Sequence, residues 1–194
     1  MTTVKLDIYI IGVGGQGIGL LSEVLLRAAD YAGLPVRGVD THGLSQRGGV
    51  VTSHLRIGNS AHSALIQAGC ADMVIALERN EALRGLNSHL ADRGTLVYYD
   101  TEWQPLAVRL GKESPLEPSV ISDECKRRGI REIRVTPTEL SDPRMQNVAL
   151  LATVARLGLL PSVTSLHYEK AMADLLGGKT LESNLTLFSQ LLGS

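Results

Sequence analysis

The stretch LDIYIIGVGGQG at residues 6–17 decides the fold class of this chain. Residues 6–11 form a nearly continuous apolar run with β-branched side chains, which is typical of a strand buried on both faces of a parallel sheet. The glycines that follow end the strand, and over residues 17–32 apolar side chains recur every three or four positions, which predicts a helix. Residues 36–39 predict a second strand that ends at Asp40. The opening part of the chain is therefore expected to form a strand, helix, strand unit.

The rest of the chain repeats this alternation of strand and helix patterns. Residues 101–118 contain three prolines and little periodicity, so an irregular connection is expected there. Strands that alternate with helices predict an α/β fold, namely a three-layer, Rossmann-like, mostly parallel sheet with helices on both faces. No linker is visible, so residues 1–194 are expected to form a single domain. Further strands are expected at residues 50–57, 73–77, 95–99 and 130–135, and further helices at residues 80–90, 120–128, 143–157, 166–176 and 181–192.

The overall composition narrows the classes of function. The formal net charge of −1 argues against a nucleic-acid partner, because binding to a phosphate backbone needs a surplus of Lys and Arg on one face. The start of the chain has no basic segment, and glycines interrupt its apolar run well before the roughly 20 residues that a bilayer span needs. We therefore expect a cytoplasmic protein without a membrane partner.

The two cysteines, Cys70 and Cys125, lie far apart, with no CxxC motif or histidine cluster beside either. An iron–sulfur cluster usually needs four thiolates, and a cysteine-based zinc site needs a similar set of ligands. The sequence therefore predicts no metal site in this chain.

The glycine loop, residues 12–17, has two interpretations. Its GVGGQG sequence satisfies the pattern GxGxxG between a strand and a helix, with Asp40 at the end of the next strand. In a dinucleotide site the glycines approach a pyrophosphate, the helix N-terminus attracts its charge and the carboxylate binds a ribose. The chain would then be a free-standing NAD(P)- or flavin-binding oxidoreductase. In the other interpretation, the glycines only let the strand and the helix pack closely.

A polar, glycine-rich stretch follows the second strand. It reads DTHGLSQRGG at residues 40–49, where an ordinary crossover helix would stand, and SHLR comes after it at residues 53–56. A polar run of this length favours ligand binding or contact with another subunit over plain solvation.

Together these motifs resemble the small (beta) subunit of indolepyruvate ferredoxin oxidoreductase and, more broadly, the gamma subunits or domains of the 2-oxoacid:ferredoxin oxidoreductases. Members usually show a GxGGQG loop and an acidic residue ahead of a His-Gly-x-x-Gln-Arg-Gly-Gly segment; here Asp40 stands in place of the more usual Glu. The resemblance extends to ADMVIALE at residues 71–78, to NVALL at residues 147–151, and to Asn184 before Phe188. It therefore spans nearly the whole chain.

The resemblance implies that the chain is one subunit of an enzyme and carries no cofactor itself. A large partner subunit would hold thiamine diphosphate and the iron–sulfur clusters, with coenzyme A as co-substrate and ferredoxin as electron acceptor. The complex would convert an indolepyruvate or other arylpyruvate and coenzyme A into an acyl-coenzyme A, carbon dioxide and reduced ferredoxin. The isolated chain would then be inactive, whether monomeric or homo-oligomeric. A scaffold or regulatory protein that keeps the fold without the activity is a third alternative.

His42 and Arg47 are the candidate catalytic residues. The guanidinium of Arg47, beside glycines, can bind a phosphate or carboxylate through two hydrogen bonds, or it can pair with Asp40 or Glu78. His42 and His54 can exchange protons near neutral pH, although a lone histidine is more often only a hydrogen-bonding residue. The residues expected to contact coenzyme A, another ligand or the partner subunit are Gly12, Gly14, Gly15, Gln16, Gly17, Asp40, Ser45, Gln46, Gly48, Gly49 and His54.

A basic cluster at residues 126–128, with Arg131 and Arg134 beyond it, ends one of the predicted helices. Cations at a helix C-terminus complement the helix dipole, which is a sufficient reason for their presence. Docking of an acidic ferredoxin is the alternative, but Asp123 and Glu124 dilute the positive charge.

Overall fold

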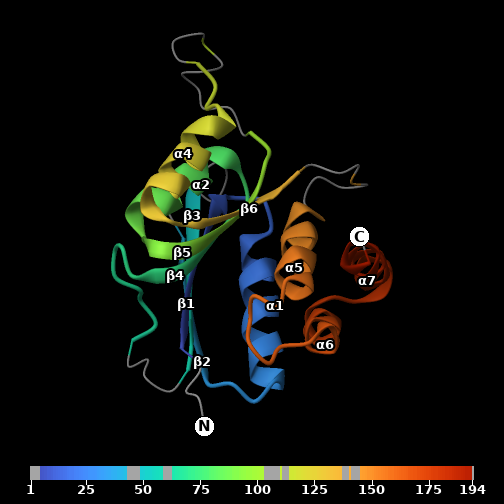
Figure 1. The fold of residues 1–194 in the computed structure, drawn as a ribbon. Helices are drawn as coiled ribbons and strands as arrows, with labels where there is room; N and C mark the ends of the chain where they lie inside the picture. The colour runs from blue at the N-terminus through green and yellow to red at the C-terminus, as the bar shows by residue number, and fades with distance from the viewer. Residues whose placement is uncertain are drawn as a thin grey trace.

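A computed structural model describes residues 5–42, 49–58, 63–102, 110, 114–136, 140 and 145–193, with the backbone alone at residues 41 and 42. Its strands form one six-stranded sheet in the order β2-β3-β1-β4-β5-β6, with helices on both faces (Figure 1). Among the described strands β3 alone runs against the common direction, which confirms the mostly parallel α/β sheet. The strands are β1 (Leu6–Val13), β2 (Val36–His42), β3 (Val50–Ile57), β4 (Ala71–Ala76), β5 (Leu90–Tyr99) and β6 (Arg131–Val135).

The described helices form the two outer layers (Figure 1). On one face α1 and α5 lie against the sheet, α6 packs on α1 and α7 packs on α5, whereas α2 and α4 cover the other face. Within the part of the chain that the structure describes, no helix combines the length and apolar character that crossing a bilayer requires. The helices are α1 (Ile18–Tyr31), α2 (Arg79–Ser88), α4 (Pro118–Arg128), α5 (Gln146–Arg156), α6 (Ser165–Leu175) and α7 (Gly178–Leu192).

The side chains of β1 explain why the sheet has a hydrophobic core on each face. Successive side chains of a strand point to opposite faces. Ile8 and Ile10 therefore join the core under α1 and α5, whereas Tyr9 and Ile11 join the core under α2 and α4. This double burial is the reason for the continuous apolar run from which the strand was predicted.

The strand order differs from a simple strand, helix, strand unit. β2 runs in the same direction as β1, but β3 lies between them and pairs antiparallel with both. The chain thus returns from β2 as a neighbouring antiparallel strand and then crosses to β4 on the far side of β1. The carboxyl ends of β1 and β4 therefore form the switch point of the sheet, where α/β proteins bind their ligands.

The predicted elements agree with the structure except at some ends. The strand expected at residues 95–99 begins earlier, at Leu90, and its pairing with β4 changes register between Ala71 and Met73. The backbone of Arg93 takes a positive φ of 63° in this irregular stretch. Its polar sequence lacks the apolar pattern from which a strand is predicted, so this part of β5 was not predicted. The helix start expected at residue 143 lies outside the described residues, and α5 is described from Gln146.

Gly85 shows how tightly α2 packs on the sheet. A Cβ atom at this position would lie 2.8 Å from Cγ1 of Val74 and 3.1 Å from Cγ2 of Ile11. Alanine normally stabilises a helix by about 1 kcal/mol relative to glycine. Overpacking a filled core costs about 1–3 kcal/mol. We therefore expect Gly85→Ala to lower the free energy of unfolding in urea, whereas Gly19→Ala in α1, which has open space around it, raises it. Equal responses would contradict this account of the packing.

Candidate functional site

The glycine loop, residues 12–17, follows β1 at the carboxyl edge, the edge of the sheet where the parallel strands end. The backbone N–H of Gly14 donates to the carbonyl oxygen of Gly49 at 2.9 Å. Gly49 directly precedes β3, so the structure brings together one end of the predicted polar stretch and the middle of the glycine loop. These are two of the three motifs on which the family resemblance rests.

Gln16 folds back onto its own loop. Its Oε1 accepts a hydrogen bond from the backbone N–H of Val13 at 2.8 Å, and the residue is only 6% exposed. A Cβ atom at Gly12 would lie 2.9 Å from that oxygen and 3.1 Å from Cβ of Leu77. The structure therefore shows a local bond of the Gln16 side chain within its own loop, and the predicted contact with a ligand or the partner stays a prediction.

The other end of the loop presents backbone donors. Gly15 and Gly17 have positive φ values of 102° and 83°, and Gly17 caps α1 with no side-chain hydrogen bond. Their N–H groups donate no hydrogen bond among the described residues. Nδ2 of Asn147, at the start of α5, donates to the carbonyl oxygen of Gly17 at 3.2 Å and fixes this end of the loop. Free N–H groups at a helix N-terminus are suited to an anion.

Asp40 lies in β2, two strands away from β1. It stands opposite Ser53 of β3 in the register, and Oγ of Ser22 in α1 donates to its Oδ1 at 3.3 Å. In a dinucleotide-binding fold the acidic strand is the direct neighbour of the glycine-loop strand. Here β3 separates the two, which removes the support for the dinucleotide interpretation.

Most of the predicted polar stretch is not described. The backbone of His42 ends β2, and Gly49 is placed beside the glycine loop, but Ser45, Gln46, Arg47 and Gly48 lie outside the described residues. The roles predicted for these residues stay predictions.

His54 lies in the middle of β3 and is 6% exposed. Its Nδ1 accepts the backbone N–H of Ile66 at 3.1 Å, and its ring meets Tyr9 edge-on, with 5.0 Å between ring centroids. His89, at the end of α2, stacks on Tyr9 at 3.8 Å. Burial lowers the pKa of His54 and of His89. The role predicted for His54 in ligand or subunit contact stays a prediction, and the described surroundings are those of a packed, hydrogen-bonded residue.

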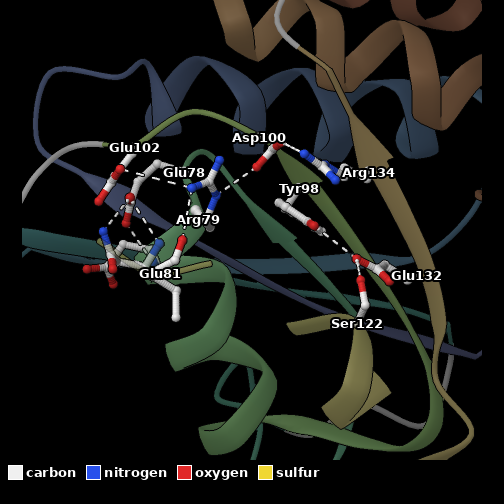
Figure 2. Close-up of polar contacts among 11 residues, drawn as sticks. Glu78, Arg79, Glu81, Tyr98, Asp100, Glu102, Ser122, Glu132 and Arg134 are labelled. Atoms are coloured by element: carbon white, nitrogen blue, oxygen red, sulfur yellow. Dashed lines mark hydrogen bonds and ion pairs between the residues drawn. The ribbon is translucent and has the colours of Figure 1, made fainter. Parts of the chain in front are cut away.

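Two buried acidic residues, Glu78 and Glu81, stand beside the switch point, and their sites were missed from the sequence (Figure 2). Glu78 is 1% exposed, and its carboxylate accepts the backbone N–H groups of Asn80 at 3.0 Å and of Glu81 at 2.5 Å. It therefore caps α2. Glu81 is 4% exposed, and burial raises its pKa to about 7. A carboxyl group with this pKa can gain or lose a proton at neutral pH.

A clasp of two arginines around Asp100 holds the same edge together (Figure 2). Asp100 follows β5 and is 6% exposed; Nε of Arg79 donates to its Oδ1 at 2.8 Å, and Nε of Arg134 donates to its Oδ2 at 2.6 Å. Arg79 also donates through Nη1 to the carbonyl oxygen of Leu116 at 2.9 Å. The clasp therefore joins the beginning of α2 to the ends of β5 and β6 and to the segment before α4.

The basic cluster at the end of α4 is largely paired. Arg127 makes two hydrogen bonds to Glu124, at 2.7 and 2.6 Å, and Nε of Arg128 bonds to Asp92 at 2.7 Å. Lys126 lies 3.4 Å from Asp123. These pairs, and the place of the cations in the last turn of α4, support the structural explanation of the cluster more than ferredoxin docking.

The cysteines lie apart in the environments that the structure describes. Cys70 is exposed before β4, whereas Cys125 is buried against the core of α4, where burial raises its pKa to about 11. In the described ranges, no three His, Cys, Asp or Glu side chains gather in a way that suits a metal ion.

The fold and the glycine loop define an α/β protein of the Rossmann-like class whose switch point lies between the carboxyl ends of β1 and β4. Residues 7–191 match the family described as pyruvate ferredoxin/flavodoxin oxidoreductase, and the chain belongs to that family. It is 35% identical over 187 residues to indolepyruvate oxidoreductase subunit IorB of Archaeoglobus fulgidus, a match that covers 93% of this chain and 90% of that protein. The family predicted from the motifs is thereby confirmed.

Solved structures agree with the fold. The gamma subunit of a keto/oxoacid ferredoxin oxidoreductase from Geobacter sulfurreducens has a TM-score of 0.65 at 20% identity, with 97% of this chain and 96% of that chain covered. A 2-oxoglutarate:ferredoxin oxidoreductase from Magnetococcus marinus, solved with 2-oxoglutarate, coenzyme A and succinyl-CoA bound, has a TM-score of 0.69 at 18% identity. That match covers 96% of this chain and 30% of the longer chain.

Proposed function

We propose that this chain is the cofactor-free subunit of a heteromeric indolepyruvate or arylpyruvate:ferredoxin oxidoreductase. The complex oxidatively decarboxylates the 2-oxoacid with coenzyme A and yields an acyl-coenzyme A, carbon dioxide and reduced ferredoxin. The observation that carries this proposal is the 35% identity to an indolepyruvate oxidoreductase subunit over 93% of the chain.

The redox cofactors are assigned to a large partner subunit. Two cysteines, one buried in a core and one exposed, do not fit the four thiolates that an iron–sulfur cluster needs. The partner holds these clusters and thiamine diphosphate, which supplies the electron sink for the decarboxylation. The isolated chain is inactive in this proposal, and ferredoxin accepts the electrons from the complex.

The glycine loop is assigned to coenzyme A or to the partner. The N–H groups of Gly15 and Gly17 donate no hydrogen bond to another described residue and lie at the start of α1, which has no side-chain cap, so they suit a phosphate of coenzyme A. The hydrogen bond from Gly14 to Gly49 joins the loop to the last residue of the polar stretch, and this supports a role for His42 and Arg47, in the same stretch, beside the loop. These residues bind and orient the co-substrate, and they complete an active site whose reacting centre lies on the partner.

Reconstitution tests the proposal. The chain is purified alone and after co-expression with a thiamine diphosphate- and cluster-binding large subunit, and reduction of a ferredoxin-substitute dye is followed with indolepyruvate and coenzyme A. We expect turnover only from the complex and only with coenzyme A present. Turnover by the isolated chain, or micromolar binding of NAD, NADP or a flavin to it, would support the free-standing alternative instead.

A further inference from the structure

Glu81 lies in the first turn of α2, next to the switch point. We propose that Glu81 is a proton-exchange residue of the carboxyl edge, which accepts the proton released when the thiol of coenzyme A is acylated. The S–H bond breaks and its proton passes to the Glu81 carboxylate, while the sulfur electron pair forms the thioester bond to the acyl carbon. The bond that would hold this acyl group to the thiamine diphosphate of the partner would break, with its electron pair left on that cofactor. The electrons of the oxidation leave to ferredoxin through the partner. This inference rests on the proposed function.

The first support is the incomplete pairing of this carboxyl group. Glu81 is 4% exposed, and its Oε2 is buried without a hydrogen-bond partner. Its one charged partner at that oxygen among the described residues is Arg84, which forms an ion pair with it at 3.3 Å without hydrogen-bond geometry, from a side chain that is 58% exposed. A buried polar atom without a hydrogen bond lowers the stability of a protein. The group is therefore explained better by chemistry than by structure.

Glu78 caps the N-terminus of α2, so Glu81 is not required for this cap. The donors at the start of α2 bond to Glu78, which accepts the N–H groups of Asn80 and of Glu81 itself. The two carboxyl groups thus have different environments: Glu78 accepts two backbone N–H groups of α2, whereas Oε2 of Glu81 accepts no hydrogen bond among the described residues. A buried carboxyl group in the second kind of environment is suited to proton exchange.

The position of Glu81 directs its side chain to the ligand edge. The Cα–Cβ bonds of a helix tilt toward its N-terminus, and the N-terminus of α2 is the end that adjoins β4 at the carboxyl edge. Glu81 faces Glu78 and Arg84 of its own helix and Tyr9 of β1, which are its charged or titratable neighbours among the described residues. Burial and the charge of Glu78 raise the pKa of Glu81 to about 7, whereas Arg84 lowers it.

The test compares Glu81→Gln with wild type in the reconstituted complex. Gln keeps the shape and cannot take up a proton, so we expect kcat/KM for coenzyme A to fall at least about tenfold at neutral pH. The rise of the wild-type rate with pH, centred near the pKa of about 7, should disappear in the variant. Glu124→Gln, the same change on the surface of α4, is the matched control and should leave rate and pH profile unchanged.

Two readouts on the isolated chain separate this role from a structural one. Because the pKa of Glu81 is raised on folding, its ionisation lowers stability as pH rises from about 4.5 to about 7. Glu81→Gln should therefore unfold at a higher urea concentration than wild type at about pH 8, with a smaller difference at about pH 5. Carbon-13 NMR of labelled carboxyl groups should show a midpoint near neutral pH that Glu81→Gln removes.

Each outcome has one meaning. An active wild-type complex whose pH profile is unchanged by Glu81→Gln would overturn the inference and leave the proposed function intact. The same holds if Glu81 titrates like an ordinary carboxyl group, or if Glu81→Gln unfolds more easily at alkaline pH. A wild-type complex without coenzyme A-dependent turnover contradicts the proposed function and, with it, this inference.

Discussion

Asp100→Ala is expected to lower the free energy of unfolding by about 3 kcal/mol, because it leaves two arginines without their shared partner in a mostly buried setting. Asp100 is 6% exposed, and the side chains of Arg79 and Arg134 are 16% and 43% exposed. The partial exposure of Arg134 lets water replace part of its lost interaction, so we expect the lower end of the usual range for a broken buried pair. Urea unfolding followed by circular dichroism measures the change.

Asp100→Asn and Asp123→Ala make this prediction specific. Asn keeps the shape and one acceptor oxygen, so Asp100→Asn should lower the free energy of unfolding less than Asp100→Ala. Asp123 pairs with Lys126 at the surface, where the two side chains are 74% and 77% exposed, and its replacement should have no measurable effect. Equal effects of Asp100→Ala and Asp123→Ala would show that the clasp contributes nothing beyond a surface ion pair.

The fold was predictable wherever the signal is local. The buried strands at residues 6–11 and 50–57 and the helices around Leu21 and Leu151 follow from apolar periodicity, which a chain segment carries by itself. Strand order is a property of pairing between distant segments. Nothing in the pattern of residues 50–57 shows that this strand inserts between β1 and β2, and the expected strand, helix, strand unit was incomplete for that reason.

The candidate site was predictable only in part. The glycines of residues 12–17 predicted the loop, because a tight turn and a close backbone approach need glycine. The roles of Gln16, Asp100 and Glu81 depend on which atoms the fold brings near them. Gln16 was predicted to contact a ligand or the partner subunit, whereas its hydrogen bond with the N–H of Val13 depends on how the loop folds and is not visible in the sequence. Glu81 looked like an ordinary helix residue, since burial of a single carboxyl group leaves no trace in the sequence.

Arg47→Ala should cause the largest loss of activity in the reconstituted complex, about 100-fold in kcat/KM for coenzyme A. A guanidinium that makes two charge-assisted bonds to a phosphate or carboxylate contributes roughly tenfold for each bond. Arg47 stands two residues before Gly49, whose carbonyl oxygen accepts the N–H of Gly14 in the glycine loop. This bond joins Gly49, the end of the polar stretch, to the glycine loop, and under the proposed function Arg47 and the start of α1 bind the same anion.

Arg47→Lys and Arg37→Ala distinguish this role from a general effect of charge. Lysine keeps the charge but loses the planar pair of donors, so it should recover only a small part of the activity. Arg37, exposed in β2, serves as the matched control, and its replacement should leave kcat/KM unchanged. If Arg47→Ala assembles with the partner and turns over like wild type, the polar stretch serves only to hold the subunits together. That result would favour the scaffold alternative over a role of Arg47 in binding coenzyme A.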